Sequence, residues 1–420
     1  MASGEDGLSR APVGPRPKSA SGRTAFGLMT DRNFGPFFFA NLASNSGTWF
    51  QNIAAVLLIY HLTGSSTLVG LVSALQFGFA LVLSVWAGMW ADHYDRKRLI
   101  ISGQSLGLFA ALALAYLSLR GIAVWQILGL VALAGIGHAV TSPALQASIT
   151  QLVPPADVGQ AVALNSVTYN LARAVGPALG AIVYVRFGPA VSFTVNAFSY
   201  LGLIVVLALI HLSAIHRDGT EDRSILAGFR YVRRSPALIG CLVGVGALGF
   251  AMDPVNTLTP AMVDLFGREE QLVGYMVGLF GAGAVVAAIF VRRLRSRSTR
   301  GQTGTRALIV LGGMMGLYAV SPTPEVAFVA LFLGGSAFLL GVSDFTAVMH
   351  ELLDDGIRGR VMALWGMAFL GVRPIAAIAH GGIGDLLGPR AGITVAVLVA
   401  LAAATVVRRT VARGQCAELR

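Results

Sequence analysis

The sequence predicts an all-α membrane protein with twelve transmembrane helices, arranged as two pseudo-symmetric six-helix bundles. Three observations support this prediction. Of the 420 residues, 55% are hydrophobic and 12% are charged, whereas a soluble domain is about 25% charged. Apolar segments of about 20 residues, the length that crosses the hydrocarbon core, recur along the chain. The charged stretch 213–235 divides these segments six and six.

The predicted spans define the domains of the chain. The first bundle is expected over 34–213 and the second over 236–408, joined by a cytoplasmic linker over 214–235. A disordered cytoplasmic tail, 1–33, precedes the bundles, and a second cytoplasmic tail, 409–420, follows them. The individual spans are expected at 36–60, 66–90, 98–120, 123–145, 161–185, 189–212, 237–262, 271–292, 305–321, 325–350, 361–386 and 389–408.

The two halves of the chain resemble each other. Shifted by 200 positions, residues 133–189 lie on residues 333–389 without a gap. The shift pairs Arg173 with Arg373, and it pairs the two Gly-Pro steps that begin at Gly188 and Gly388. An internal repeat of this kind predicts two parallel halves that enclose a site between them, the arrangement of a carrier in which one half rocks against the other.

The net charge of +11 follows membrane topology. With both termini placed in the cytoplasm, most Lys and Arg fall in the tails and loops of that side. The opposite side holds only Arg120, Arg186, Arg268 and Arg390. This positive-inside asymmetry predicts a multi-pass membrane protein with both termini in the cytoplasm. It also argues against a nucleic-acid partner.

Cys241 and Cys416 are the two cysteines of the chain, and they predict neither a disulfide nor a metal site. The linker contains a segment, 225–234, in which apolar residues share one helical face and arginines lie off it. We expect a short amphipathic helix on the inner leaflet there; the alternative is a plain tethering loop.

Five of the ionisable residues inside predicted spans, where a charge normally faces the protein interior, stand out. They are the candidates for a substrate site or a proton relay. Some could instead be structural ties, Arg373 with Asp344 or Arg173 with Asp253, and the histidine could simply bond to a neighbouring helix. The five are His138, Arg173, Asp253, Asp344 and Arg373.

Uncharged polar residues form stripes on several of these spans. In 36–60 they recur at helical spacing, which places them on one face. We expect these stripes to line a cavity; hydrogen bonds between helices are the alternative. The residues are Asn41, Asn45, Thr48 and Asn52 in the first span, Asn165 and Tyr169 in the fifth, and Asn256 and Thr257 beside Asp253 in the seventh.

A charged hairpin, 88–98, joins the second and third spans, and 354–360 is its counterpart in the second half. Opposite charges on these two loops predict a conformational latch on the cytoplasmic side. In this hypothesis Asp92 meets the positive N-terminal end of the eleventh helix when the cavity opens outward. A solvated loop is the alternative. The latch residues would be Gly88, Asp92, Arg96, Arg358 and Arg360.

At these residues the chain resembles the major facilitator superfamily, and within it the branch of bacterial exporters for enterobactin and macrolides. The resemblance covers about 34–408 and implies the major facilitator fold. Asp95 stands where many members of the superfamily have Gly, a variant that looks like this branch. The resemblance is carried by 44–49, 60–65, 88–98, 143–144, 152–154, 163–166, 176–180 and 358–362.

Within the fifth span, Gly176 and Pro177 resemble the core of a motif associated with antiporters. The match is partial, because Ala172 and Ala181 stand where that motif prefers Gly. Pro177 removes a backbone donor and bends a helix, while Gly176 and Gly180 permit close packing. We expect a hinge or a seal here. The arginine that many proton-coupled drug exporters carry in the fourth helix is absent, and His138 is the ionisable group there.

The resemblance implies a secondary active transporter that exports an amphipathic small molecule, such as a drug, antibiotic or siderophore, by proton antiport with alternating access. Asp253 or Asp344 would carry the proton, and Arg173 and Arg373 would act on those carboxylates or on substrate anions. The expected partners are the substrate, protons and the lipid bilayer, and we expect a monomer without cofactors. A metabolite importer or facilitator of the same fold is the alternative. A membrane enzyme is disfavoured, because the sequence has no nucleophile motif, phosphate loop or metal cluster.

Overall fold

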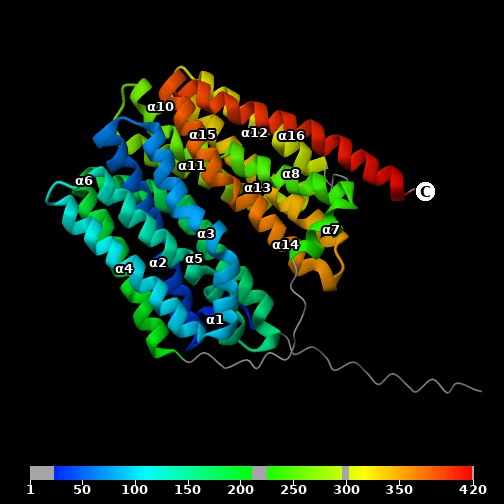
Figure 1. Cartoon of the computed structure of the whole chain (residues 1–420), viewed down its shortest axis with the longest axis horizontal. Coiled ribbons are helices and arrows are strands. Elements are labelled where there is room, and N and C mark those ends of the chain that lie inside the picture. Colours follow the sequence, from blue (N-terminus) through cyan, green and yellow to red (C-terminus); the bar gives the residue numbers. More distant parts are fainter. Residues whose placement is uncertain (1–22, 211–224, 296–301, 419–420) are drawn as a thin grey trace, which may run out of the picture.

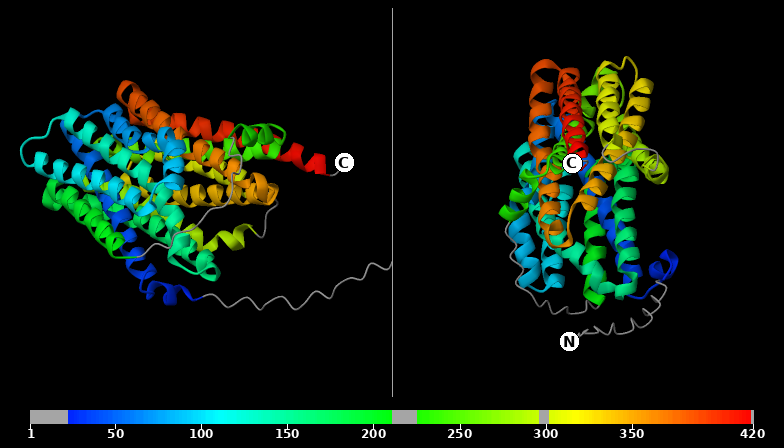
Figure 2. Two further views of the ribbon diagram at one scale, coloured as in Figure 1. Left: turned by 60° about the horizontal axis from the view of Figure 1, so that its bottom comes forward. Right: turned by 90° about the vertical axis from the view of Figure 1, so that its right-hand side faces the viewer.

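The computed structural model describes residues 23–210, 225–295 and 302–418, and most of these residues are helical. Figures 1 and 2 show that the long helices run side by side along a common direction. The helices are α1 (Ala25–Met29), α2 (Phe34–Thr63), α3 (Ser66–His93), α4 (Arg96–Ser118), α5 (Val124–Leu152), α6 (Val158–Leu209), α7 (Ile225–Arg233), α8 (Pro236–Ala251), α9 (Pro254–Thr257), α10 (Thr259–Leu265), α11 (Gln271–Arg295), α12 (Gln302–Val320), α13 (Pro324–Leu352), α14 (Asp355–Leu370), α15 (Val372–Leu387) and α16 (Pro389–Glu418), with a 3-10 turn at Pro155–Asp157.

The helices form two bundles. In the first, α2 packs along α6, and α5 packs against both α3 and α4. In the second, α13 packs against α11 and α12, while α16 packs against α8 and α12. The bundles meet where α3 lies against α15 and α6 lies against α11 (Figure 1). Two pairs of helices therefore carry most of the contact between the bundles.

Ten stretches of the described helices are long and apolar enough to cross a membrane. The predicted fifth and sixth spans are the two arms of α6, which share one of these stretches on either side of a kink at Gly188. The predicted first span is α2, which has 30 residues but is not among the ten. By length and hydropathy, the described residues therefore contain ten candidate spans. Helix α2 is not one of them because its polar residues lower its mean hydropathy.

The repeat predicted from the sequence is visible in the backbone. Helices α5 and α13 begin and end 200 positions apart, at Val124–Leu152 and Pro324–Leu352. Gly188 and Gly388 both adopt a positive φ, of 80° and 89°, which glycine tolerates without strain. Each is followed by proline, so both halves turn from one helix into the next by the same backbone geometry.

The seventh and eleventh spans were predicted as continuous helices, and in both the structure differs. The seventh is divided into α8, α9 and α10, because Pro254 and Pro260 lack the N–H that a helix interior needs. The eleventh is divided at Gly371 into α14 and α15, three residues before Pro374. Both breaks lie in the second bundle, and both place polar side chains near the irregular backbone.

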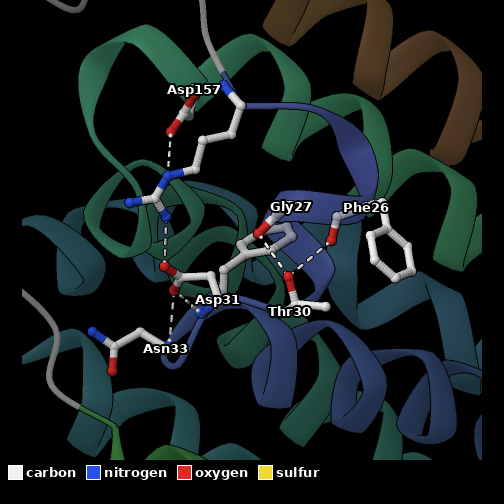
Figure 3. Close-up of polar contacts among 8 residues, drawn as sticks. Phe26, Gly27, Thr30, Asp31, Asn33 and Asp157 are labelled. Atoms are coloured by element: carbon white, nitrogen blue, oxygen red, sulfur yellow. Dashed lines mark hydrogen bonds and ion pairs between the residues drawn. The ribbon is translucent and has the colours of Figure 1, made fainter.

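The predicted disordered tail, 1–33, is wrong for its last eleven residues. Residues 1–22 lie outside the described part of the chain, but 23–33 contain α1 and a clasp of hydrogen bonds (Figure 3). The backbone N–H of Arg23 donates to Asp157 Oδ1 at 2.7 Å, and the Arg23 guanidinium lies 2.7 Å from Asp31 Oδ2. Burial raises the pKa of Asp31, but hydrogen bonds from the N–H groups of Phe34 and Asn33 and from Arg23 outweigh it and lower that pKa below its ordinary value.

The second tail was predicted to begin at residue 409, but α16 continues without a break to Glu418. Of the predicted linker, 214–224 lie outside the described residues. The rest includes α7, the short helix that the sequence predicted. Its Phe229 and Arg230 are exposed, while Gly228 lies against Arg360 of α14. The linker therefore contacts the start of the eleventh span.

Large apolar side chains are exposed around the outside of the bundles. They lie on helices long enough to cross a bilayer, and an apolar surface of this extent suits contact with lipid. Among them are Phe109, Trp125, Phe198, Ile289 and Leu398.

Candidate transport site between the bundles

A small cavity of about 10 Å³, room for about one water molecule, lies where the two bundles meet. Trp49 of α2 contributes one wall, and α11 contributes another. The third comes from the broken seventh span, where the Nδ2 of Asn256 is buried without a hydrogen-bond partner. The lining is apolar and aromatic except for this amide: Trp49, Met252, Val255, Asn256, Val277, Phe280 and Gly281.

The polar stripe predicted on the first span bonds mainly to protein. Asn41 is buried and donates from Nδ2 to Asn165 Oδ1 of α6 at 2.8 Å. Asn45 Nδ2 donates to the Asn41 carbonyl at 2.9 Å, and Thr48 Oγ1 donates to the Ser44 carbonyl at 2.9 Å. The structure thus brings Asn41 and Asn165 together as a tie between α2 and α6.

His138 and Tyr169 are both exposed. His138 lies one turn after Gly135, whose α-carbon is packed against the backbone of α3. Tyr169 lies two turns before Gly176, which is packed against Trp49. Each of these exposed side chains therefore lies one or two turns along its helix from a close contact with another helix.

Asp253 lies in the turn between α8 and α9, and its side chain is 2% exposed. Its Oδ2 accepts a hydrogen bond from Thr257 Oγ1 at 2.9 Å. The same oxygen lies 3.3 Å from Nδ1 of His380, which comes from α15 and is fully buried. The sequence had offered Arg173 as a partner for this acid; the side chain of Arg173 lies outside the described residues.

His380 was not among the predicted site residues. A histidine on an apolar helix could have been noted from the sequence alone. Its pairing with a carboxylate 127 positions away could not, because it depends on how α15 packs against α9.

Asp344 and Arg373 do not form the tie that the sequence allowed. Asp344 is buried, and its Oδ2 accepts a hydrogen bond from the N–H of Gly304 in the first turn of α12 at 2.8 Å. A carboxylate is favoured at a helix N-terminus. The guanidinium of Arg373 lies 4.4 Å from the ring centroid of Phe77 in α3. In the described part of the chain Arg373 makes no hydrogen bond or ion pair, and its Nε is buried.

The predicted hinge in the fifth span remains helical through Pro177. A side chain at Gly176 would come within 2.7 Å of Trp49 Cβ, and one at Gly180 within 3.1 Å of Phe50 Cα. The carbonyl of Pro177 faces Gly274 of α11. These three residues let α6 approach α2 on one side and α11 of the other bundle on the other.

The cytoplasmic latch predicted at 88–98 and 354–360 stays a prediction. The side chain of Asp92 lies outside the described residues, and Gly88 is placed only as helical backbone. Arg96 donates to the Ala147 carbonyl at 3.4 Å within the first bundle, and Arg358 donates to the Leu353 carbonyl at 3.1 Å. Arg360 lies against Gly228 of α7.

The structure contains a latch at the opposite end, which the sequence did not predict. We call this the distal latch: the contacts that join the bundles where α2 ends and α3 begins. Asp385 of α15 accepts hydrogen bonds from Ser65 Oγ at 2.6 Å and from the N–H groups of Ser66 and Thr67 at 2.6 and 3.0 Å. A carboxylate of one bundle thereby occupies the N-terminus of a helix in the other.

Two further pairs complete the distal latch. The Tyr60 hydroxyl donates to Asp264 Oδ2 at 2.8 Å, and His61 Nδ1 lies 2.9 Å from Glu270 Oε1. The acids come from the second bundle and the end of α2 from the first. The distal end of the interface is therefore closed by polar contacts in this structure.

The comparison with known proteins agrees with this architecture. A family described as transmembrane secretion effector, of the major facilitator superfamily, matches residues 23–418. The chain belongs to this family. It is therefore a multi-pass membrane transporter of the major facilitator fold and not an enzyme.

Relatives of this chain include transporters of similar length. It is 26% identical over 371 residues to the enterobactin exporter EntS of Shigella boydii, covering 86% of this chain and 88% of that one. It is 25% identical over 392 residues to an uncharacterised MFS-type transporter, YfiS, of Bacillus subtilis, covering 90% of each.

Solved structures share the fold of this chain. A bacterial homologue of the human lysosomal transporter Spinster superposes with a TM-score of 0.75 at 12% identity, covering 91% of this chain and 97% of that one. A POT family transporter superposes with a TM-score of 0.73 at 12% identity, covering 89% and 95%.

Proposed function

We propose that this protein exports an amphipathic small molecule, of the drug, antibiotic or siderophore class, across the bacterial inner membrane by proton antiport. One observation carries the proposal. The turn that holds the buried Asp253 also presents Asn256 to the apolar cavity between the bundles. A single irregular turn thus adjoins the apolar cavity at the bundle interface on one side and holds a buried carboxyl group on the other.

As the bundles open, this cavity would widen into a site for an amphipathic ligand, and the residues that line it suit such a ligand. Trp49 and Phe280 offer aromatic surface from opposite bundles, and the unpaired amide of Asn256 offers a hydrogen bond. Ligand sites are commonly apolar with a few placed polar groups. Because both bundles supply walls, a relative rotation of the bundles changes the cavity, as alternating access requires.

The direction of transport is proposed from two arguments. EntS is named as an exporter, and it is similar to this chain over most of both lengths. With both termini in the cytoplasm, the distal latch faces the periplasm, and its opening would release substrate outward.

Export can be tested with purified protein in proteoliposomes. The first step is growth of cells with and without the gene on a panel of toxic amphipathic compounds, which supplies a candidate substrate. Flux of that compound is then measured with an imposed pH gradient, with the gradient collapsed by a protonophore, and in protein-free vesicles.

The proposal expects movement of the compound against the proton flow and its loss on collapse of the gradient. Movement of the compound with the protons would indicate symport and so favour the importer. Flux that ignores the gradient would indicate a facilitator. Either result contradicts proton-driven export.

A further inference from the structure

The second bundle contains a buried pair of titratable groups that has no structural counterpart at the equivalent place in the first. Asp253 and His380 are 2% and 0% exposed, and their facing atoms lie 3.3 Å apart. Thr257 donates to the same carboxylate oxygen, and the Phe250 ring lies edge-on to the imidazole with centroids 4.6 Å apart. The outer nitrogen of the ring, Nε2, is buried without a hydrogen-bond partner.

The hydrogen bond to Asp253 fixes which nitrogen can accept a proton. An ionised Asp253 can only accept, so Nδ1 of His380 is then the donor to Oδ2, and in the neutral ring Nε2 carries the free lone pair. Most buried polar atoms in proteins are partnered, and an orphan of this kind calls for an explanation. A site for a transferable proton provides one.

Charge balance decides how many protons the pair can hold. With a neutral ring and an ionised Asp253, the buried pair carries one uncompensated negative charge, which is costly. One added proton on Nε2 turns the ring into an imidazolium and makes the pair neutral. The pair therefore has room for one exchangeable proton.

The other charged groups near His380 are engaged elsewhere. Helix α15 packs against α3, α8, α9, α14 and α16. On α15 itself, Arg373 stacks on Phe77 of α3, and Asp385 caps α3. Arg390 of α16 donates to the Ser321 carbonyl. In the described part of the chain, Asp253 is the charged group that contacts the imidazole.

The Asp253–His380 pair lies between the cavity and the distal latch. Asp253 belongs to the turn whose Met252, Val255 and Asn256 line the cavity. His380 lies five residues before Asp385, which joins α15 to the other bundle at the distal latch. Because Pro254 leaves this turn without a continuous helical ladder, a shift of α15 can change the 3.3 Å contact without unfolding a helix.

We infer that Asp253 and His380 together form the proton-binding site of the antiport cycle, with Nε2 of His380 as the atom that takes up the proton. This inference rests on the proposed function. The proton forms an N–H bond at Nε2 on the side that supplies it, and the bond breaks to water once the bundles have exchanged access. No electrons are transferred, and one positive charge crosses with each proton.

The test compares two kinds of flux in proteoliposomes, using a substrate identified from the panel. Accumulation driven by a pH gradient requires proton binding. Exchange of labelled for unlabelled substrate at equal pH requires only alternating access. The variants are His380→Asn, which keeps an amide near the place of Nδ1 but cannot take up a proton, and Asp253→Asn. The matched control is His350→Asn, an exposed histidine at the end of α13.

The inference expects both site variants to lose gradient-driven accumulation and to keep exchange, while His350→Asn keeps both. Gradient-driven accumulation by His380→Asn at the wild-type rate would overturn it. That result leaves the proposed function intact, whereas absence of gradient-driven flux in the wild-type protein would remove the proposed antiport itself.

A second measurement covers variants that lose both kinds of flux. Purified protein in detergent is titrated with the substrate, binding is followed by tryptophan fluorescence, and released protons are followed with a pH indicator dye. The inference expects the wild type to release protons on binding and His380→Asn to bind without release. Binding by His380→Asn with unchanged proton release would overturn the inference. If His380→Asn neither folds nor binds, the test rests on Asp253→Asn, and normal binding and proton release by that variant would also overturn the inference.

Discussion

Arg373 is a buried arginine whose guanidinium lies on the ring of Phe77 and, among the described residues, meets no carboxylate. Contact with an aromatic face returns about 0.5–2 kcal/mol, whereas the penalty for burying a charge is several kcal/mol per ion. Because the aromatic contact offsets only part of the burial penalty, an anion that binds the Arg373 guanidinium would stabilise it. Its place between α15 and α3 puts it at the interface of the bundles.

We expect Arg373→Gln to weaken transport of a carboxylate compound at least about tenfold in KM, which is about 1.4 kcal/mol, with a smaller effect on its methyl ester. The reason is that only the acid loses a charge-assisted partner. Flux of the matched acid and ester measures this, and Arg268→Gln, at an exposed arginine, serves as the control. Equal losses for the acid and the ester would show that Arg373 acts only on packing.

The candidate residues show how far sequence reasoning reaches at this scale. Asp253, Asn256 and Arg373 were predictable because polar groups on apolar helices are rare and costly. Their partners were not. Asn41 was expected on a cavity wall and is bonded to Asn165 in the structure, because the rotation of α2 against α6 decides which face of the stripe meets protein.

At the scale of elements, the distal latch closes the interface with a carboxylate on a helix N-terminus. Asp385 receives three hydrogen bonds from the start of α3, and charge-assisted bonds of this kind are stronger than neutral ones. The sequence predicted the same device at the other end of the molecule. The hairpin 88–98 is recognisable in the sequence because it contains several charged residues close together. Asp385 is a single acid near a helix end, so the sequence does not mark it as a latch residue.

We expect Asp385→Ala to shift the bundles toward a state that is open at the distal end, since three bonds across the interface are lost together. Spin labels at Leu62 and Leu387, both exposed at this end, report the change as a longer distance in pulsed EPR. Glu325→Gln, an exposed acid at the start of α13, should leave the distance distribution unchanged. An unaltered distribution in Asp385→Ala would show that packing alone closes this end.

The clasp around α1 should respond to acid. The pKa of Asp31 is lowered in the folded protein, so its contribution is present above the ordinary carboxyl value of about 4 and is lost as the pH falls through the lowered value. A spin label at Phe26, which is exposed, should gain mobility only below about pH 4.

The same label tests the cause of that response. Asp31→Asn should be mobile at neutral pH, because the amide cannot replace the charge that Arg23 contacts. Asp95→Asn alters another helix-capping carboxylate, the N-cap of α4, and should behave as the unaltered protein. Mobility that does not depend on Asp31 would mean that apolar contacts of α1 hold the segment.

The helices themselves were largely predictable, and their interruptions were not. Apolar runs of span length place α3, α4, α5, α12 and α13 close to where they lie. The prolines at 254, 260 and 374 were visible in the sequence, but a membrane helix can continue through a proline, as α6 does at Pro177. Whether a proline bends or breaks a helix depends on which neighbours satisfy the freed backbone groups.

At the scale of the whole molecule, the charge asymmetry of the loops predicts the orientation in the membrane. We expect a cysteine at Leu387 to react with a membrane-impermeant maleimide in intact cells. A cysteine at Phe26 should react only after the cells are opened, because the distal end and α1 lie at opposite ends of the bundles (Figure 1). Labelling of Phe26→Cys from outside would reverse the proposed topology and with it the direction of export.

The shared register of the two halves carries a consequence for how they differ. Counting 200 positions back from His380 leads to Gly180, whose missing side chain lets α6 lie against Phe50. The same step leads from Asp344 to Ala144 and from the buried Phe338 to His138. One location in the repeat thus serves as a contact point in the first copy and as a place for ionisation in the second. The two halves therefore share a backbone arrangement but differ in where they carry ionisable side chains. The twofold pseudosymmetry holds for the backbone and not for the distribution of charge.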